Sequence, residues 1–350
     1  MEDKLNERND DIFSQTFSNF KRPSYTPYLR TYNEEEKYMN SSFSLYNSTC
    51  RMCGKDSQKL ENENYSMKRA IQNLTNKNNA LIQENENLKK RRTENEQNRK
   101  MEKKLSLIEK IIKKTVNETD NLSNLYNLGN KYLIIELIAK NYITTEKVAD
   151  VMFEVDRANF TQNLPYLNRP IPIGFNVTIS APHMHALALE WLSDFCLPNS
   201  YILDIGSGSG FLTLALSKMA NDSATVVGVE HINELAEFGI ENVQKNNSYL
   251  INNKKIIFVK EDGRRGYQIH KYKKDIYKAI HVGAASESLP QELVDQLACN
   301  GRMFIPIGRS GEDQFIYIVD KDFRGNITTK KILQVNYGML TSIYTQLSDY

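Results

Sequence analysis

The second half of the chain alternates between short apolar runs and helical patterns, and this alternation restricts the possible folds more than any other feature. Strands are predicted at 201–205, 225–229, 256–259, 279–282 and 302–307, with closing strands at 314–319 and 330–340. Helices are predicted at 183–195, 211–220, 233–245 and 289–298. A helix between two strands returns the chain so that the strands run parallel. The pattern therefore predicts a doubly wound, mostly parallel α/β sheet, with its ligand site beyond the carboxyl ends of the strands.

The composition divides the 350 residues near residue 125. Most of the 16 glycines and all five histidines follow residue 150, whereas the first hundred residues are rich in Asn, Lys and Glu. Such a polar segment cannot bury enough apolar surface to offset the entropy of ordering it. We therefore predict a largely disordered extension at 1–125 and a folded domain at 126–350. The domain is expected to begin with two helices, at about 131–140 and 144–155, followed by an irregular stretch up to Ser180.

Apolar residues recur at every seventh position within the extension, as they do at the d positions of a coiled coil. They are Leu60, Met67, Leu74, Leu81 and Leu88. Three of the four matching a positions are Asn, the fourth being Ile71, and several buried Asn side chains weaken such a seam. Two interpretations stay open: a coiled coil within 57–115 through which the chain dimerises, and a single solvated helix.

Other features bear on location and partners. The N-terminus has no apolar leader, no apolar run reaches the length of a membrane span, and the four cysteines form no disulfide framework. We therefore expect a cytoplasmic protein with no membrane partner. Lys89–Arg92 is a weak candidate for a nuclear address, and Cys50 and Cys53 have the spacing of half a zinc site without a second pair. With 45 basic and 43 acidic residues, the net charge of +2 gives no electrostatic argument for a nucleic-acid partner.

The first strand of the alternation ends at an acidic residue and runs into a glycine loop. Asp204 is followed by glycines at 206, 208 and 210, which let a ligand approach the backbone at the start of the next helix. The dinucleotide pattern G-x-G-x-x-G fails, because Phe211 and Thr213 stand where a third glycine is required. A phosphate loop fails as well, since no Gly-Lys-Ser/Thr sequence follows.

Acidic residues also follow the next two strands. Glu230 can accept hydrogen bonds from ribose hydroxyls, and Asp262–Gly263 can contact an adenine edge. The carboxylate of Asp204 suits a cationic ligand better than a pyrophosphate. A ligand with adenine, ribose and a positive charge but no phosphate is S-adenosyl-L-methionine, so the sequence predicts this methyl donor and no metal.

Five segments of the domain resemble, in order, those of the protein-L-isoaspartate (D-aspartate) O-methyltransferase family. They are residues 173–186 (IGFNVTISAPHMHA), 203–210 (LDIGSGSG), 262–264 (DGR), 279–285 (AIHVGAA) and 301–308 (GRMFIPIG). The resemblance covers about 133–346 and implies a seven-stranded, Rossmann-like methyltransferase sheet. It also implies methyl transfer to the free α-carboxylate of L-isoaspartyl, and D-aspartyl, residues in damaged proteins, which starts repair through a succinimide.

The resemblance further implies roles for single residues. Ser180 matches the active-site serine, and we interpret its hydroxyl as a donor that holds the substrate carboxylate. A carboxylate needs no strong general base, and no G-x-S-x-G elbow surrounds this serine. The implied cofactor-binding residues are Val177, Thr178, Ile179, His185, Asp204, Gly206, Gly208, Glu230, Asp262, Gly263, Thr341 and Gln346.

The chain departs from the family's pattern at three places. The family often has Asp or a near equivalent where Tyr166–Asn168 stands, and Glu230 stands where many members have Asp. Gly338 and Met339 interrupt a more usual Tyr-Val-Pro-Leu-Thr sequence, a change that is expected to loosen the segment that closes over the site.

Two other functions compete with this one. The main alternative is a catalytically weak module that binds S-adenosyl-L-methionine and recruits isoaspartyl proteins, although the intact Ser180 argues for an enzyme. A nucleic-acid methyltransferase is disfavoured, because Asn163–Tyr166, which is similar to the N-P-P-Y box of such enzymes, does not follow the fourth strand. We therefore expect isoaspartyl proteins and peptides as partners, and a monomeric catalytic domain.

Overall fold

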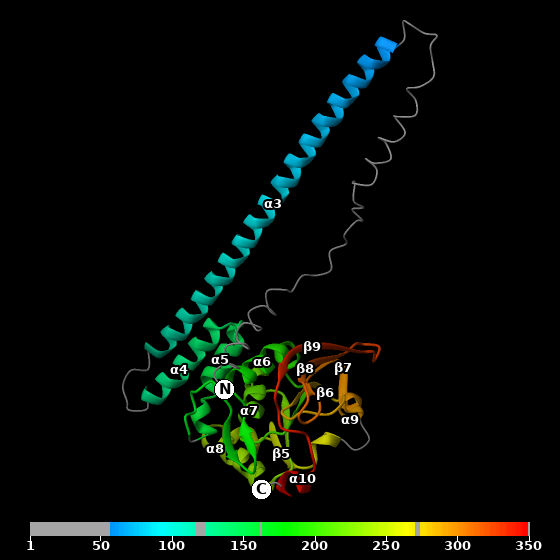
Figure 1. Cartoon of the computed structure of the whole chain (residues 1–350). Coiled ribbons are helices and arrows are strands. Elements are labelled where there is room, and N and C mark those ends of the chain that lie inside the picture. Colours follow the sequence, from blue (N-terminus) through cyan, green and yellow to red (C-terminus); the bar gives the residue numbers. More distant parts are fainter. Residues whose placement is uncertain (1–56, 117–123, 162, 270–273, 349–350) are drawn as a thin grey trace. The chain divides into compact units, whose positions relative to one another are not determined.

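The structure is a computed structural model that describes residues 57–116, 124–161, 163–269 and 274–348 (Figure 1). Cys50 and Cys53, and the first part of the predicted extension, lie outside these residues. The chain divides into two compact units, one ending at Glu102 and the other beginning at Lys103. Among the described residues, no helix is long and apolar enough to cross a membrane, and no group of three His, Cys, Asp or Glu could hold a metal.

A single helix, α3 (Ser57–Val116), covers the segment with the seven-residue repeat (Figure 1). Within the unit that ends at Glu102, the side chains of Leu74, Leu81 and Leu88 are 66%, 58% and 45% exposed. Their spacing places them along one face of the helix. A long helix is therefore present here, and pairing of two copies through this face stays a prediction.

The last turns of α3 belong to the second unit and pack into its core. Leu107 and Ile111 are buried there, and Lys110 forms an ion pair of 2.7 Å with Glu146, the first residue of α5 (Glu146–Glu154). The predicted boundary at residue 125 assigns both apolar residues to the extension. That boundary stays a prediction, which the truncations described below test.

The second unit is built on a seven-stranded sheet in the order β5-β4-β3-β6-β7-β8-β9. Its strands are β3 (Tyr201–Ile205), β4 (Thr225–Glu230), β5 (Ile256–Lys260), β6 (Tyr277–Val282), β7 (Leu297–Ile307), β8 (Gln314–Lys321) and β9 (Ile327–Val335). Strands β3 to β7 run parallel, and β8 and β9 are antiparallel to their neighbours. The predicted doubly wound, mostly parallel sheet is confirmed. Its strand order reverses between β3 and β6, which is where ligands bind in such sheets.

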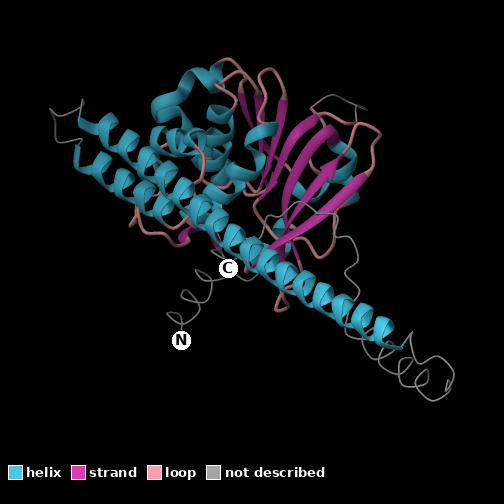
Figure 2. Ribbon diagram, turned by 90° about the horizontal axis from the view of Figure 1, so that it is seen from above, coloured by secondary structure: helices cyan, strands magenta, loops and turns pink. Residues whose placement is uncertain are grey.

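The sheet has helices on both of its faces (Figure 2). Alternate residues of its central strands supply one core on each face. Ile202 and Phe304 belong to the larger core, whereas their neighbours Leu203 and Met303 belong to the smaller one. The larger core contains residues of α4 (Asn124–Ala139), α5, α6 (Pro182–Leu192), α7 (Phe211–Met219) and α8 (Asn233–Asn252). The smaller core contains residues of α9 (Gln291–Gln296). Helices therefore cover both faces, as predicted.

The stretch before Ser180 was predicted to be irregular, and this prediction is wrong. It contains a hairpin of β1 (Ile171–Gly174) and β2 (Val177–Ile179). The turn residues Phe175 and Asn176 both have positive φ, 53° and 56°. Two-residue hairpin turns of this kind favour sequences such as Asn-Gly, so a Phe in the first turn position hid the hairpin.

Element ends near the C-terminus also differ from the prediction. The helix expected up to residue 298 stops at Gln296, and Leu297 already starts β7. The last strand ends at Val335 rather than at residue 340, and a short helix, α10 (Ile343–Ser348), follows after an irregular segment. This irregular segment lines the candidate site.

Two truncations test which part of α3 the domain needs. Residues 103–350 retain Leu107 and Ile111, and we expect them to melt at the same temperature as the full chain. Residues 126–350 lack both side chains, whose burial contributes about 3–6 kcal/mol, so a clearly lower Tm is expected in differential scanning calorimetry. Ile111→Ala in the full chain is the matched control, with an expected loss of about 2–5 kcal/mol. Equal melting temperatures for the two truncations would contradict this role of α3.

Candidate active site

A cavity of about 1350 Å³ lies at the carboxyl ends of the parallel strands. It is lined by the loops that follow β3, β4, β5 and β6, by the β1–β2 hairpin and by the segment after β9. Every residue predicted for the site lines this cavity: Val177, Thr178, Ile179, Ser180, His185, Asp204, Gly206, Gly208, Glu230, Asp262, Gly263, Thr341 and Gln346. The fold thus brings together residues that are far apart in the sequence, and their individual roles stay predictions.

The glycine loop crosses the floor of the cavity between β3 and α7. Gly206 and Gly208 have φ of 73° and 47°, values that L side chains rarely adopt. Gly210 precedes α7 with φ of 82°, and a Cβ there would lie 3.0 Å from the carbonyl oxygen of Gly239. The loop therefore keeps the backbone open to a ligand at the start of the helix.

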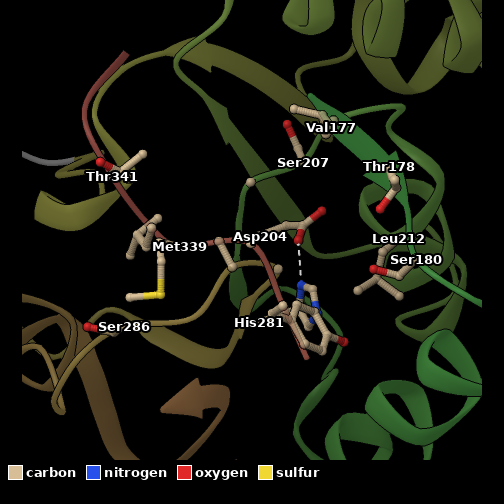
Figure 3. Close-up of a pocket in the computed structure, with 18 of the residues that line it drawn as sticks. Val177, Thr178, Ser180, Asp204, Ser207, Leu212, His281, Ser286, Met339 and Thr341 are labelled. Atoms are coloured by element: carbon tan, nitrogen blue, oxygen red, sulfur yellow. Dashed lines mark hydrogen bonds and ion pairs between the residues drawn. The ribbon is translucent and has the colours of Figure 1, made fainter. Parts of the chain in front are cut away.

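The hydroxyl of Ser207 provides an independent sign of a polar ligand. Its Oγ is buried and has no hydrogen-bond partner among the described residues, and Ser207 lines the cavity (Figure 3). Buried polar groups are nearly always hydrogen-bonded, so an unpaired hydroxyl at a cavity wall indicates a partner that binds there. Together with the glycine loop, this hydroxyl fits a methyl donor that carries polar groups.

Asp204 lies at the reversal point of the strand order and is only 1% exposed. One carboxylate oxygen accepts a hydrogen bond of 2.6 Å from the Thr213 hydroxyl, and the other lies 2.8 Å from Nδ1 of His281 (Figure 3). The register of the sheet puts His281 directly opposite Asp204 on β6. His281 was not predicted as a site residue, although a His near the end of an apolar strand beside a buried acid is a usable signal.

Glu230 is buried and connects the second strand to the glycine loop. Its carboxylate accepts hydrogen bonds from the backbone N–H of Gly208 at 3.2 Å and of Ile232 at 3.0 Å. Burial raises the pKa of this carboxyl, and the backbone donors offset part of that rise. The acid predicted to bind ribose thus also holds the loop predicted to bind the methionine end.

Asp262 also lines the cavity and is paired with the neighbouring Arg264. Its carboxylate accepts from the backbone N–H of Arg264 at 3.1 Å and forms an ion pair of 2.5 Å with the guanidinium of Arg264. The hydrogen bonds from Arg264 lower the pKa of Asp262. The short helix Gly263–Arg265 begins at this capped turn, which fixes the loop after β5.

Ser180 directly follows the hairpin strand β2 and lies two residues before Pro182, which starts α6. Its hydroxyl contacts the phenol of Tyr337, which lies in the segment after β9 and also lines the cavity. Burial raises the pKa of Tyr337, so the phenol keeps its proton at physiological pH. Tyr337 was not predicted as a site residue, because nothing in the sequence shows that the segment after β9 returns to the hairpin.

Hydrogen bonds connect the segment around Tyr337 to the rest of the site, and the expectation that Gly338 and Met339 loosen it stays a prediction. Buried Gln314 accepts from the backbone N–H of Tyr337 at 2.6 Å and donates to its carbonyl at 3.1 Å. Ala285 continues this anchoring, since its N–H donates to Gly338 at 2.8 Å and its carbonyl accepts from Leu340 at 2.7 Å. Figure 3 shows Met339 and Thr341 of this segment on the opposite side of Asp204 from Thr178 and Ser180.

Comparison with known proteins agrees with this geometry. Residues 128–344 match the family model described as protein-L-isoaspartate(D-aspartate) O-methyltransferase. The chain belongs to this family. It is 40% identical to a protein-L-isoaspartate O-methyltransferase of Caenorhabditis elegans over 213 residues, 61% of this chain and 92% of that protein. It is also 40% identical to the Triticum aestivum enzyme over 223 residues, 63% of this chain and 94% of that protein.

A solved structure supports the same assignment. The protein-L-isoaspartate O-methyltransferase of Plasmodium falciparum, in complex with S-adenosyl-L-homocysteine, superimposes with a TM-score of 0.56 at 32% identity. The match covers 61% of this chain and 98% of that one. The predicted seven-stranded methyltransferase fold is therefore confirmed, and S-adenosyl-L-methionine is the methyl donor of this family member.

Two polar contacts show how this methyltransferase closes the rim of its cavity. The side-chain oxygen of Asn168 accepts from the backbone N–H of His183 at 3.0 Å and lies 2.8 Å from its Nδ1. Gln346 of α10 lies 2.7 Å from Nε2 of His231 and donates to the carbonyl of Phe175 at 3.2 Å. Gln346 therefore ties the loop after β4 to the hairpin turn, in addition to its predicted place beside the cofactor.

The contact between Tyr337 and Ser180 leads to a testable prediction. Ser180→Ala is expected to lower kcat far more than affinity for S-adenosyl-L-homocysteine. Tyr337→Phe removes one hydrogen bond to Ser180. Such a bond contributes about 1 kcal/mol, so kcat is expected to fall about fivefold. Tyr277→Phe is the matched control, since its buried hydroxyl donates to Tyr267 away from Ser180.

A double-mutant cycle separates this role from a loss of stability. In a Ser180→Ala background, Tyr337→Phe should have almost no further effect on kcat, because its partner is already absent. Full additivity of the two substitutions would show that Tyr337 does not act through Ser180.

Proposed function

We propose that this chain transfers a methyl group from S-adenosyl-L-methionine to the free α-carboxylate of L-isoaspartyl residues, and of D-aspartyl residues, in damaged proteins. The observation that carries the proposal is the gathering of Ser180 and the predicted donor-binding residues around one cavity. Membership of the family over residues 128–344 supports it.

The chemistry asks little of the protein beyond placement. When bound, S-adenosyl-L-methionine supplies an electrophilic methyl on a sulfonium, and a neutral thioether leaves as the carboxylate oxygen forms its bond to the methyl carbon. No proton moves in this step, so no general base is needed. The acceleration comes from holding the carboxylate in line with the methyl and from excluding water.

The chain's own residues supply this placement. The Ser180 hydroxyl donates to one oxygen of the substrate carboxylate and leaves the other free to react. The Tyr337 phenol, which stays protonated, contacts the Ser180 hydroxyl and restricts its position. The buried Asp204 carboxylate, held by Thr213 and His281, places negative charge at the floor of the cavity, where a sulfonium ligand is attracted.

The product ester then reacts without further help from the protein. The backbone nitrogen of the following residue attacks the ester carbonyl and expels methanol, which gives a succinimide. Hydrolysis of the succinimide opens the ring to normal aspartate or back to isoaspartate. Repeated cycles therefore convert damaged residues to normal ones.

Two synthetic peptides test the proposal. They are identical except that one contains L-isoaspartate and the other L-aspartate, and each is incubated with methyl-labelled S-adenosyl-L-methionine. We expect base-labile label on the isoaspartyl peptide alone, and none with Ser180→Ala at the same enzyme concentration. Binding of S-adenosyl-L-methionine without label on either peptide would contradict the proposal. That result would favour the alternative of a catalytically weak module that recruits isoaspartyl proteins.

We further propose that two chains pair in parallel through α3. The exposed Leu74, Leu81 and Leu88 supply d positions of the seam, and Asn78 and Asn85 supply a positions at which identical chains can pair their own amides. Glu84 at a g position would face Lys89 at the e position of the second chain, and opposite charges there favour a parallel pair.

Light scattering tests this pairing. We expect the full chain to have twice its monomer mass, and residues 103–350 to be monomeric. Leu81→Glu should shift the full chain towards monomer, whereas Gln83→Glu, on the outward face, should not. A monomeric full chain at micromolar concentration would rule out the pairing.

We also propose a cytoplasmic location. Cys196 and Cys299, the described cysteines, are free thiols, which suits a reducing compartment. Lys89–Arg92 is exposed on α3, so a nuclear fraction detected by imaging that depends on these four residues would extend the proposal to the nucleus.

A further inference from the structure

Arg157 is a buried cation behind the wall of the cavity. It begins the short helix Arg157–Asn159 and is only 1% exposed. Among the described residues, no carboxylate forms an ion pair with it, and its Nε has no hydrogen-bond partner. Burying an unpaired cation is costly, so its position calls for a functional reason.

The two terminal nitrogens of Arg157 reach two residues of the predicted site. Nη2 donates to the carbonyl of Ile179 at 3.4 Å, directly before Ser180. Nη1 lies 3.3 Å from Nδ1 of His185. The guanidinium also lies 5.9 Å from the centre of the Phe211 ring, on which His185 stacks at 4.6 Å.

This contact determines the proton position on His185. A guanidinium has five donors and no acceptor, so Nδ1 of His185 must accept and carries no proton. A neutral imidazole with an unprotonated Nδ1 carries its proton on Nε2. Burial, followed by the charges of Arg157, His281 and His183, lowers the pKa of His185, so the ring stays neutral.

We propose that Arg157 is a positioning residue that fixes His185 as the Nε2–H tautomer, so that His185 donates a hydrogen bond to a carboxylate bound in the cavity. The inference rests on the proposed function, which brings two carboxylates to this site. One belongs to the methionine end of the methyl donor, and the other is the α-carboxylate of the substrate. A neutral donor suits either, because it holds the oxygen without transferring a proton to it.

The tautomer can be measured without any turnover. We would record nitrogen-15 spectra of the histidine side chains in the full chain, with His185 identified by its loss in His185→Phe. One protonated nitrogen, assigned as Nε2, and one bare Nδ1 are expected at neutral pH. Arg157→Met should redistribute the proton between the two nitrogens, and Arg157→Lys should restore the original pattern in part.

Arg302→Met is the matched control. Arg302 is also a partly buried arginine stacked on aromatic rings, but it pairs with Asp320 and does not line the cavity. Its substitution is expected to lower the melting temperature and to leave the His185 signals unchanged. A protonated Nδ1 in the wild-type chain, or an unchanged pattern in a folded Arg157→Met chain, would overturn the proposal.

Binding and kinetics identify which carboxylate is held. His185→Phe keeps the stacking on Phe211 but removes the hydrogen-bond donor. His185→Gln supplies a side-chain N–H in its place. If His185 holds the carboxylate of the methyl donor, His185→Phe should weaken S-adenosyl-L-homocysteine binding about tenfold, and His185→Gln should restore it. If the peptide carboxylate is held, the same change should appear in KM for the isoaspartyl peptide instead.

No change in either quantity would overturn the proposed donor role. These outcomes are distinct from failure of the proposed function, in which the wild-type chain labels neither peptide while its histidine spectrum stays interpretable.

Discussion

The buried hydrogen bonds of Asp204 hold the centre of the site together. This carboxylate lies where the strand order reverses, and it connects β3 to α7 through Thr213 and to β6 through His281. A buried carboxylate with both oxygens hydrogen-bonded is fixed in position. Removing either hydrogen bond leaves a buried oxygen without a partner, which lowers the stability of the fold. The glycine loop starts directly after it, so these bonds fix the point at which the loop leaves the sheet.

Around that centre, single polar side chains connect several of the segments that form the site. Glu230 holds the glycine loop, Gln314 holds the segment with Tyr337, and Gln346 bridges His231 and the hairpin turn. Each of these side chains bonds to backbone groups or rings of a different segment. Hydrogen-bonded polar side chains therefore connect the walls of the cavity, whereas apolar support comes from the two cores on the opposite faces of the sheet.

The strands and helices could be predicted because their periodicity is local. The run 201–205 and the glycines after Asp204 carry their own signals, and all predicted site residues line one cavity. What failed depends on contacts between distant segments. The hairpin turn at Phe175 and Asn176 is imposed by its surroundings rather than by its residue types. Neither the return of Tyr337 to Ser180 nor the approach of Arg157 to His185 leaves a local pattern, because each contact forms only after the chain has folded.

The irregular segment after β9 has a consequence for how the protein matures during synthesis. The cavity needs Tyr337, Thr341 and Gln346, which are made after the whole sheet. Synthesis runs from the N-terminus, so the central strands and the glycine loop are made before the segment that completes the cavity. Completion of the cavity is therefore a later step than formation of β3 and β4, which carry Asp204 and Glu230.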